Sequence, residues 1–475
     1  MNESAVPSPL PLRDRRRPSA PIPLTGRLGP WRYYRALRTN PITTWRQEAY
    51  ETPILADRGP LGDIIVVNAP DAIRRVFLDN VGNYAKDRLQ LEKLGPGLGR
   101  GLLTTDGEDW KFQRRTLAPL FQPQGVVDYV PIMVGAVRDR LARFETAATE
   151  GATIDMAAEM TALTYEIISR TVFSSELQTS AEAMRAAISH YFAVLGRIDL
   201  WDFLKVPSWL PRPAQWRVRS STQVFRNEVH RLLKRRRTRE AVAEKLPRDI
   251  VTLLTKARDP ETGSGLGEEI IHDNLVTFIG AGHETTANAL GWTLFLLSEF
   301  PWADDRLAHE VDTVLNRSVP TAQDIPKLVF ARMVIEEAMR LYPPVPFLSR
   351  QALGPDRLGD VEVRPRSLVV VAPWVVHRHR LLWEEPELFE PERFAPDRRA
   401  LVPRFGYLPF GAGPRICIGA GFAMQEAVIA LAMIVQRFRF RLIANAEVEP
   451  VAWITLRPSH GLPMRLERRG RTFFG

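Results

Sequence analysis

The feature that most constrains this chain is its single cysteine, Cys417, which lies in a glycine-rich loop between residues 407 and 421. One cysteine can form neither an internal disulfide nor a structural zinc site, so its role depends on its surroundings. Gly411, Gly413 and a proline let the backbone turn tightly, and residues 418–440 follow as an apolar run with helical periodicity. We therefore expect Cys417 at a helix N-terminus, where the dipole and the charge of Arg415 favour the thiolate, the form that binds a soft metal.

Two simple alternatives for this segment are a buried cysteine that acts as a small hydrophobe and a dinucleotide-binding loop. The dinucleotide pattern G-x-G-x-x-G fails, because Ile416 and Met424 occupy the two positions that the third glycine could take. The pattern F-x-x-G-x-R-x-C-x-G fits, with fixed positions at Phe410, Gly413, Arg415, Cys417 and Gly419. This loop resembles the haem-binding loop of the cytochrome P450 family, in which the cysteine thiolate is the proximal iron ligand. The resemblance implies haem contacts for Phe410, Arg415, Cys417 and Gly419.

A second part of the resemblance lies in an apolar segment, residues 271–300, whose pattern predicts a long central helix. It contains Ala281-Gly282-His283-Glu284-Thr285-Thr286, which is similar to the family's small-Gly-x-acid-Thr signature. The resemblance implies that Ala281 lies beside the haem and that Glu284 and Thr285 relay protons for O₂ activation. His283 occupies the variable position and receives no chemical role.

The residues of this segment also carry structural expectations. Thr285 can donate a hydrogen bond to the carbonyl four residues earlier and loosen the helix there. Gly280 and Gly282 should each cost the helix about 1 kcal/mol relative to alanine, so we expect that space beside the backbone is needed. A polar kink between packed helices is the structural alternative to a catalytic site.

The pattern E-x-x-R occurs four times, at Glu182/Arg185, Glu228/Arg231, Glu337/Arg340 and Glu390/Arg393. On a helix, each is a possible surface ion pair worth a few tenths of a kcal/mol. Only Glu337/Arg340 is followed by a proline-rich stretch, residues 343–346, which resembles the family's helix exit towards the haem. The resemblance implies that Arg393 joins Glu337 and Arg340 in a buried triad.

The resemblance also implies haem b (iron protoporphyrin IX) as the cofactor, and its two propionates need cationic partners. Trp110 and Arg114 fit the family's W-x-x-x-R helix, and Arg350 follows the proline-rich exit. With Arg415, these are the expected propionate partners, because a planar guanidinium can bind a carboxylate through two parallel hydrogen bonds.

The resemblance covers roughly residues 30–467 and implies one large, mainly helical domain with small β-sheets, an α+β fold with the haem between the central helix and the cysteine-loop helix. Strand-like runs in residues 52–69 and 359–373 agree with it. We expect this domain to span residues 30–475, after a flexible Arg- and Pro-rich segment, residues 1–29. That segment lacks the apolar core of a secretory signal, and we find no anchor in the sequence. The expectation is a cytoplasmic, monomeric enzyme of bacterial type, with an organelle leader as the alternative.

The formal net charge is +9, and the densest basic run is residues 231–239. We find neither a recognition motif nor interleaved aromatic residues around it, so nucleic-acid binding is not expected. A solvated helix end is the simple explanation, and a basic docking face for an acidic electron carrier is the functional one. We expect no fused flavin or iron–sulfur module, so that electrons come from a ferredoxin-type donor with its reductase. The apolar patch 192–210 is expected to line the substrate entrance, with membrane contact as the alternative.

The expected function is therefore haem-dependent hydroxylation of a C–H bond in an apolar small molecule by O₂. One rival is a thiolate-haem isomerase, dehydratase or peroxygenase, which the acid–threonine pair disfavours. The other is a non-catalytic haem gas sensor, which would need neither a proton relay nor a lid. Fatty acids, terpenoids, steroids and aromatic compounds all remain open as substrates. The expected substrate contacts are Phe278, Ala281, Val345, Phe347 and Trp453-Ile454-Thr455-Leu456.

Overall fold

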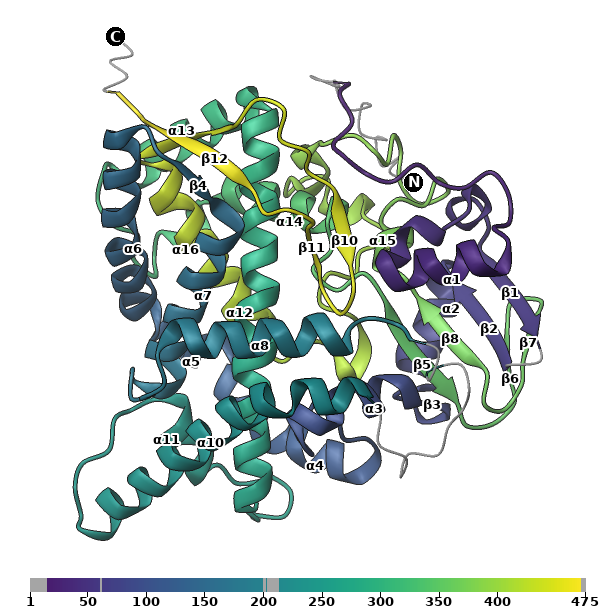
Figure 1. Cartoon of the computed structure of the whole chain (residues 1–475), viewed down its shortest axis with the longest axis horizontal. Helices are drawn as coiled ribbons and strands as arrows, with labels where there is room; N and C mark the ends of the chain where they lie inside the picture. Colours follow the sequence, from purple (N-terminus) through teal and green to yellow (C-terminus); the bar gives the residue numbers. More distant parts are fainter. Residues whose placement is uncertain (1–14, 60–61, 200–201, 203–212, 471–475) are drawn as a thin grey trace, which may run out of the picture.

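The computed structural model describes residues 15–59, 62–199, 202 and 213–470. Helices fill one side of the molecule and a five-stranded sheet lies on the other, beside α1 (Figure 1). The described α-helices are α1 (Pro30–Thr39), α2 (Pro70–Arg74), α3 (Arg88–Leu98), α4 (Gly107–Leu117), α5 (Pro123–Val127), α6 (Val130–Glu150), α7 (Met156–Phe173), α8 (Ala181–Leu195), α10 (Pro213–Ala241), α11 (Ile250–Lys256), α12 (Glu268–Glu299), α13 (Pro301–Leu315), α14 (Val329–Leu341), α15 (Pro373–Val376) and α16 (Ala420–Val435). The predicted mainly helical α+β fold is confirmed.

Short strands form the small β-sheets of the molecule. The described strands are β1 (Ile54–Gly59), β2 (Gly62–Val67), β3 (Tyr84–Ala85), β4 (Thr153–Asp155), β5 (Leu348–Ala352), β6 (Asp356–Leu358), β7 (Val361–Val363), β8 (Leu368–Val371), β9 (Phe438–Leu442), β10 (Pro450–Ala452), β11 (Leu456–Pro458) and β12 (Pro463–Arg468). The largest sheet has the order β1-β2-β8-β5-β3, and only its β2–β8 pair is parallel. Its first strands come from the predicted run 52–69 and β8 comes from the run 359–373, so both strand predictions are confirmed.

The central helix predicted over residues 271–300 is α12, which begins at Glu268 and ends at Glu299. Two acidic residues in its first turn complement the helix dipole, and Pro301 starts the next helix. A Cβ at Gly282 would lie 2.6 Å from Cδ1 of Ile168 on α7, so this glycine lets the two helices pack closely. The expected need for space is confirmed at Gly282, whereas a Cβ at Gly280 would meet its nearest atom, in the Phe192 ring, at an ordinary 3.4 Å.

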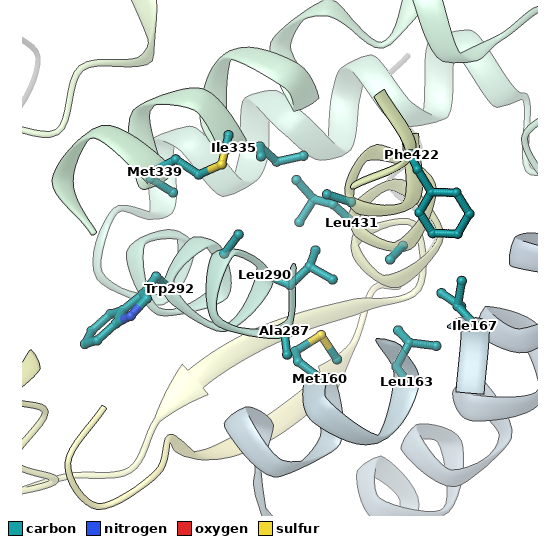
Figure 2. Close-up of a cluster of buried hydrophobic side chains, with 14 of the residues drawn as sticks. Met160, Leu163, Ile167, Ala287, Leu290, Trp292, Ile335, Met339, Phe422 and Leu431 are labelled. Atoms are coloured by element: carbon teal, nitrogen blue, oxygen red, sulfur yellow. The ribbon is translucent and has the colours of Figure 1, made fainter. Parts of the chain in front are cut away.

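The core lies between α7, α12, α14 and α16, four helices from distant parts of the chain. Figure 2 shows side chains from all four helices meeting there: Met160, Leu163, Ile167, Ala287, Leu290, Trp292, Ile335, Met339, Phe422 and Leu431. Burial of this apolar surface stabilises the packing at about 25 cal/mol per Å². The packing holds α12 and the cysteine-loop helix α16 in one rigid frame.

The helix predicted over residues 418–440 is too long. Helix α16 ends at Val435, and residues Phe438–Leu442 form β9, which pairs with β12. The two phenylalanines at 438 and 440 are buried, whereas Arg439 and Arg441 between and after them are not. This alternation has the period of a strand, and an apolar helix just before it masks the change in period.

The described part of the N-terminal segment, residues 15–29, contacts the helical domain. The Ser19 carbonyl accepts a hydrogen bond from the Tyr342 hydroxyl at 2.8 Å, and Leu24 forms a β-bridge with Arg46. Residues 1–14 lie outside the described residues, and the domain boundary at residue 30 stays a prediction. Among the described residues, we find no helix whose length and hydrophobicity would allow it to cross a membrane.

The buried triad that the resemblance implied is confirmed. Arg340 Nε and Nη2 lie 2.6 and 2.7 Å from the two carboxylate oxygens of Glu337, and both side chains are fully buried. Arg393 Nε lies 3.6 Å from Glu337 Oε1. The remaining donors of Arg340 bind backbone carbonyls of His377, Pro386 and Leu388. Both charges are thus compensated, which is the condition under which an ion pair is tolerated in a core.

Replacing either partner should therefore prevent normal folding. In Glu337→Ala, the guanidinium of Arg340 would be left buried without its counter-charge, at a cost of about 3–5 kcal/mol. We expect little folded holoprotein, measured as haem content and as the free energy of unfolding in urea. Glu182→Ala is the matched control, because Glu182 has the same sequence pattern but is exposed, and it should change stability by less than about 0.5 kcal/mol. Normal haem content in Glu337→Ala would show that the pair is not essential.

Candidate active site and cofactor cavity

The loop that carries Cys417 is held in a shape that requires glycine. Gly413 has φ +69°, and a Cβ there would overlap the carbonyl oxygen of Phe77. The backbone N–H of Cys417 donates to the Phe410 carbonyl at 2.9 Å and closes the loop. Helix α16 starts at Ala420 with Gly419 as its N-cap, so Cys417 lies just before the helix, close to the expected position.

The charge balance at Cys417 differs from the expectation. Burial raises the pKa of the Cys417 thiol, and the lowering effects of the Gly419 N–H and of Arg114 do not compensate for it. Arg415 instead forms an ion pair with Asp106 and donates to the Tyr84 carbonyl at 2.7 Å. The prediction that the surroundings alone favour the thiolate is wrong, because desolvation outweighs them. Cys417 nevertheless exposes surface to the cavity, where a bound cation can stabilise the thiolate.

The start of this loop is positioned by a buried histidine, His377, which no sequence motif marks. His377 Nε2 accepts a hydrogen bond from the Leu408 N–H at 2.7 Å, and its Nδ1 lies 3.3 Å from the Arg340 carbonyl. Burial, followed by the charges of Arg340 and Arg378, lowers the pKa of His377 to about 3. The neutral imidazole therefore connects the buried triad to the cysteine loop. A lone histidine in sequence carries no signal for this role.

The four expected propionate partners, Trp110, Arg114, Arg350 and Arg415, line one cavity together with Cys417. Trp110 is buried, and the guanidinium carbon of Arg415 lies 5.4 Å from its ring centre. The Nε atoms of Arg350 and Arg415 are buried and have no hydrogen-bond partner among the described residues. Two unpaired guanidinium donors in one cavity indicate a place for an anionic group.

Lys86 adds a further cation to this cluster, and the sequence analysis missed it. Its Nζ donates to the carbonyls of Leu102 and Thr105 at 2.7 Å each, and Lys86 lines the same cavity. Burial and the neighbouring arginines lower the pKa of Lys86 to about 7, although Asp106 raises it. Burial and Arg415 likewise lower the pKa of Arg350 to about 10. Several buried cations therefore share this cavity, and their burial favours an anion beside them.

The acid–alcohol pair on α12 divides between two environments. Thr285 lines the cavity, and its Oγ1 donates to the Ala281 carbonyl at 2.9 Å, which confirms the predicted backbone bond. Glu284 is buried and is not among the cavity-lining residues; its Oε1 accepts a hydrogen bond from Thr455 Oγ1 at 2.6 Å. Glu284 Oε2 has no partner among the described residues. His283 is fully buried and does not line the cavity; its Nδ1 is hydrogen-bonded to the Ile279 carbonyl.

The cavity between α12 and the cysteine loop has a volume of about 2140 Å³. Most of the expected substrate contacts line it: Phe278, Ala281, Val345, Phe347, Trp453, Ile454 and Thr455. Leu456 does not; it is fully buried and its carbonyl accepts from the Trp292 indole. Of the expected entrance patch, Phe192 lines the cavity, whereas Trp201, Phe203, Leu204 and Trp209 lie outside the described residues.

Comparison with known proteins agrees with this geometry. A family model described as Cytochrome P450 matches residues 26–460. Cyclooctatin synthase of Streptomyces melanosporofaciens is 34% identical over 388 residues, which cover 80% of this chain and 81% of that protein. Pentalenene oxygenase of Streptomyces avermitilis is 31% identical over 401 residues, which cover 84% of this chain and 87% of that protein. The crystal structure of a cytochrome P450, CYP102L1, matches with a TM-score of 0.77 at 29% identity, covering 89% of this chain and 96% of that one.

The chain therefore belongs to the cytochrome P450 family, whose relatives here are named as oxygenases and monooxygenases. It is an enzyme of the P450 monooxygenase class, and haem b is its cofactor. The described residues fit that group: the unpaired Nε atoms of Arg350 and Arg415 suit its propionates, and Cys417 offers a sulfur ligand in the same cavity. The tight turn at Gly413 leaves no room for a side chain beside Phe77.

The low pKa of His377 predicts part of the acid sensitivity of this enzyme. Between pH 6.5, the ordinary value for histidine, and about pH 3, only the unfolded chain gains this proton. The contribution of His377 to stability is therefore complete above pH 6.5 and decreases as the pH falls, by up to about 1.4 kcal/mol per pH unit. His377→Gln keeps an acceptor for the Leu408 N–H but does not titrate. We expect its free energy of unfolding to fall less steeply between pH 6.5 and 4.

Urea denaturation of the holoprotein at several pH values measures this difference. His460→Gln, at an exposed histidine, controls for the removal of an imidazole. Equal slopes for the parent and His377→Gln would mean that His377 is not kept neutral in the folded protein.

Proposed function

We propose that this enzyme hydroxylates an apolar small molecule at a C–H bond. In the overall reaction, one O₂, two electrons and two protons convert R–H into R–OH and water. The observation that carries the proposal is that Cys417 and Thr285, from two separate elements, line one cavity with a largely aromatic and aliphatic surface. A thiol ligand, a proton-carrying group and an apolar chamber are then available at one place.

Haem, when bound, supplies an iron centre at which O₂ is activated. In our proposal Cys417 is the thiolate ligand, and electron density from a thiolate favours O–O cleavage. Arg114, Arg350 and Arg415, with the Trp110 indole, hold the propionates. Support comes from the unpaired Nε atoms of Arg350 and Arg415, because a buried N–H donor needs an acceptor. Phe410 and Gly419 also line the cavity, where they can pack against the haem.

Glu284 and Thr285 are the proposed proton carriers. Glu284 Oε2 has no partner among the described residues, so this buried carboxyl oxygen is free to carry a proton. The Thr285 hydroxyl lies in the cavity wall and already donates to the Ala281 carbonyl, so its lone pairs are free to accept. The pair disfavours the isomerase and gas-sensor alternatives, neither of which consumes protons.

For the substrate we propose a terpenoid. Two relatives are named for the oxidation of terpenoids, as Pentalenene oxygenase and Cyclooctat-9-en-7-ol 5-monooxygenase, and the latter is 32% identical to this chain. The cavity wall supports an apolar substrate: Phe121 and Phe278 meet edge to face at 5.3 Å, and Trp45 and Phe347 lie 6.1 Å apart. Such a wall selects by shape and apolar contact.

For electron supply we propose a separate ferredoxin-type protein with its reductase. Members of this family take electrons from a redox partner, and the net charge of +9 would attract an acidic carrier over a long range.

Substitution of the proposed iron ligand tests the assignment of Cys417. The chain has one cysteine, so Cys417→His removes every thiol from the molecule. We expect the variant to bind some haem through the remaining cavity contacts but to lose the red-shifted Soret band that the reduced CO complex of a thiolate-bound haem gives. Survival of that band would exclude Cys417 as the ligand.

Substitution of the proton carriers tests the reaction. The probe is whichever of a terpene hydrocarbon, a steroid and a fatty acid gives the largest haem difference spectrum. Thr285→Ala should retain haem and affinity for the probe, while more reducing equivalents end as hydrogen peroxide and less as product. Glu284→Gln should slow turnover, because general acid–base steps contribute about 10²–10⁴-fold. The measurement is product formed and peroxide released per NAD(P)H consumed. Unchanged values in both variants would favour the isomerase or sensor alternatives.

A further inference from the structure

Glu284 contacts the cavity wall through a residue from a distant part of the chain. Its Oε1 accepts a hydrogen bond from Thr455 Oγ1 at 2.6 Å, a short distance typical of a hydroxyl bound to a carboxylate. Thr455 is buried and lines the cavity, whereas Glu284 is not among the cavity-lining residues. The Thr455 hydroxyl is therefore the contact that joins this acid to the cavity wall.

The neighbouring alcohol on α12 does not make this contact. The Thr285 hydroxyl donates to the Ala281 carbonyl at 2.9 Å, so its one proton is used within the helix. Glu284 and Thr285 are thus neighbours in sequence, but the described contacts include no hydrogen bond between their side chains. The hydroxyl partner of Glu284 comes instead from the turn between β10 and β11.

The turn holds Thr455 rigidly against α12. The Thr455 carbonyl accepts from the Trp453 N–H at 3.1 Å, and the next residue donates its N–H to the Pro344 carbonyl at 2.9 Å. The carbonyl of Leu456 accepts from the Trp292 indole of α12. These backbone hydrogen bonds fix the position of Thr455 along the axis of α12. Its hydroxyl can therefore orient the Glu284 carboxylate without further ordering of either side chain.

Arg457 adds a cation next to the turn. Arg457 lies on β11, two residues after Thr455. Burial lowers the pKa of Arg457, and the charge of Glu284 raises it, so the carboxylate and the guanidinium interact. Arg457 also lies over the Trp453 ring at 4.2 Å, whose other cation contact is Arg197 at 4.7 Å. Glu284 therefore binds a hydroxyl at the cavity wall and also feels the charge of Arg457, which is not in that wall.

We propose that Thr455 is a positioning residue for oxygen activation: its hydroxyl holds the Glu284 carboxylate at the cavity wall and provides the route for its proton. When Glu284 is protonated, its carboxyl donates to Thr455 Oγ1, and the hydroxyl proton is then passed to water in the cavity. One proton enters the hydroxyl and one leaves it, so Thr455 is unchanged. This inference rests on the proposed role of Glu284.

Four variants of the holoenzyme test it: Thr455→Val, Thr455→Ser, Glu284→Gln and the double variant Thr455→Val/Glu284→Gln. A surrogate ferredoxin and reductase supply electrons, and the probe is chosen by difference spectrum as above. We expect Thr455→Val, which keeps the shape but removes the hydroxyl, to lower product formed per NAD(P)H by roughly tenfold, because a hydrogen bond to a charged group is lost. Thr455→Ser should restore most of it. The double variant should be no worse than Glu284→Gln alone.

Thr293→Val is the matched control, because Thr293 is a fully buried threonine of α12 whose hydroxyl bonds the Ala289 carbonyl. The Thr293→Val variant should form as much product per NAD(P)H consumed as the parent. A second readout does not use turnover: the falls in Tm of Thr455→Val and Glu284→Gln should add to more than the fall in the double variant, as expected for directly interacting residues.

The outcomes separate the two proposals. If Glu284→Gln lowers coupling but Thr455→Val behaves like Thr293→Val, the role of Thr455 is wrong and that of Glu284 stands. Failure of Thr455→Ser to restore coupling, or additive changes in Tm, would also overturn the role of Thr455. If Glu284→Gln leaves coupling unchanged, the proton relay of the proposed function fails, and this inference fails with it.

Discussion

The buried contact between Glu337 and Arg340 is the interaction on which the site depends. Once both carboxylate oxygens of Glu337 are occupied, the other donors of Arg340 are directed to the carbonyls of His377, Pro386 and Leu388. His377 in turn accepts from the Leu408 N–H at the start of the cysteine loop. A charge pair that is shielded from solvent thus determines where the loop that carries Cys417 begins. The connection runs through three successive contacts: Glu337 to Arg340, Arg340 to the His377 carbonyl, and the His377 ring to the Leu408 N–H.

The low-dielectric interior also makes it unfavourable to bury the cationic side chains of the cavity wall. Burial, with repulsion from neighbouring cations as a smaller cause, lowers the pKa of Lys86 to about 7 and that of Arg350 to about 10. A group that carries two carboxylates relieves this repulsion, so its binding offsets part of the cost of folding. At Cys417 the balance is similar: burial raises the pKa of the thiol, and a bound metal cation supplies the stabilisation that the surrounding residues do not.

The side of the cavity that we propose for oxygen activation is assembled from two elements. Helix α12 contributes Thr285 to the cavity wall and buries Glu284 beside it, while the turn between β10 and β11 contributes the hydroxyl that Glu284 binds. A buried carboxylate needs hydrogen-bond donors, and an α-helix cannot provide them to its own side chain because its N–H groups are used along the axis. The partner therefore comes from elsewhere in the fold.

The sequence by itself determined the family, the cysteine loop, the bidentate E-x-x-R pair Glu337/Arg340 and the position of α12, because each depends on residue types at short, fixed spacings. It also indicated that Gly282 needs space, since a glycine in mid-helix has a recognisable cost. Only the tertiary structure decided the contacts of Lys86, His377 and Thr455 and the direction of the pKa shift at Cys417. Each of these depends on partners from distant segments of the chain or on the depth of burial. Neither contacts across the fold nor the exclusion of water leaves a periodic pattern in the sequence.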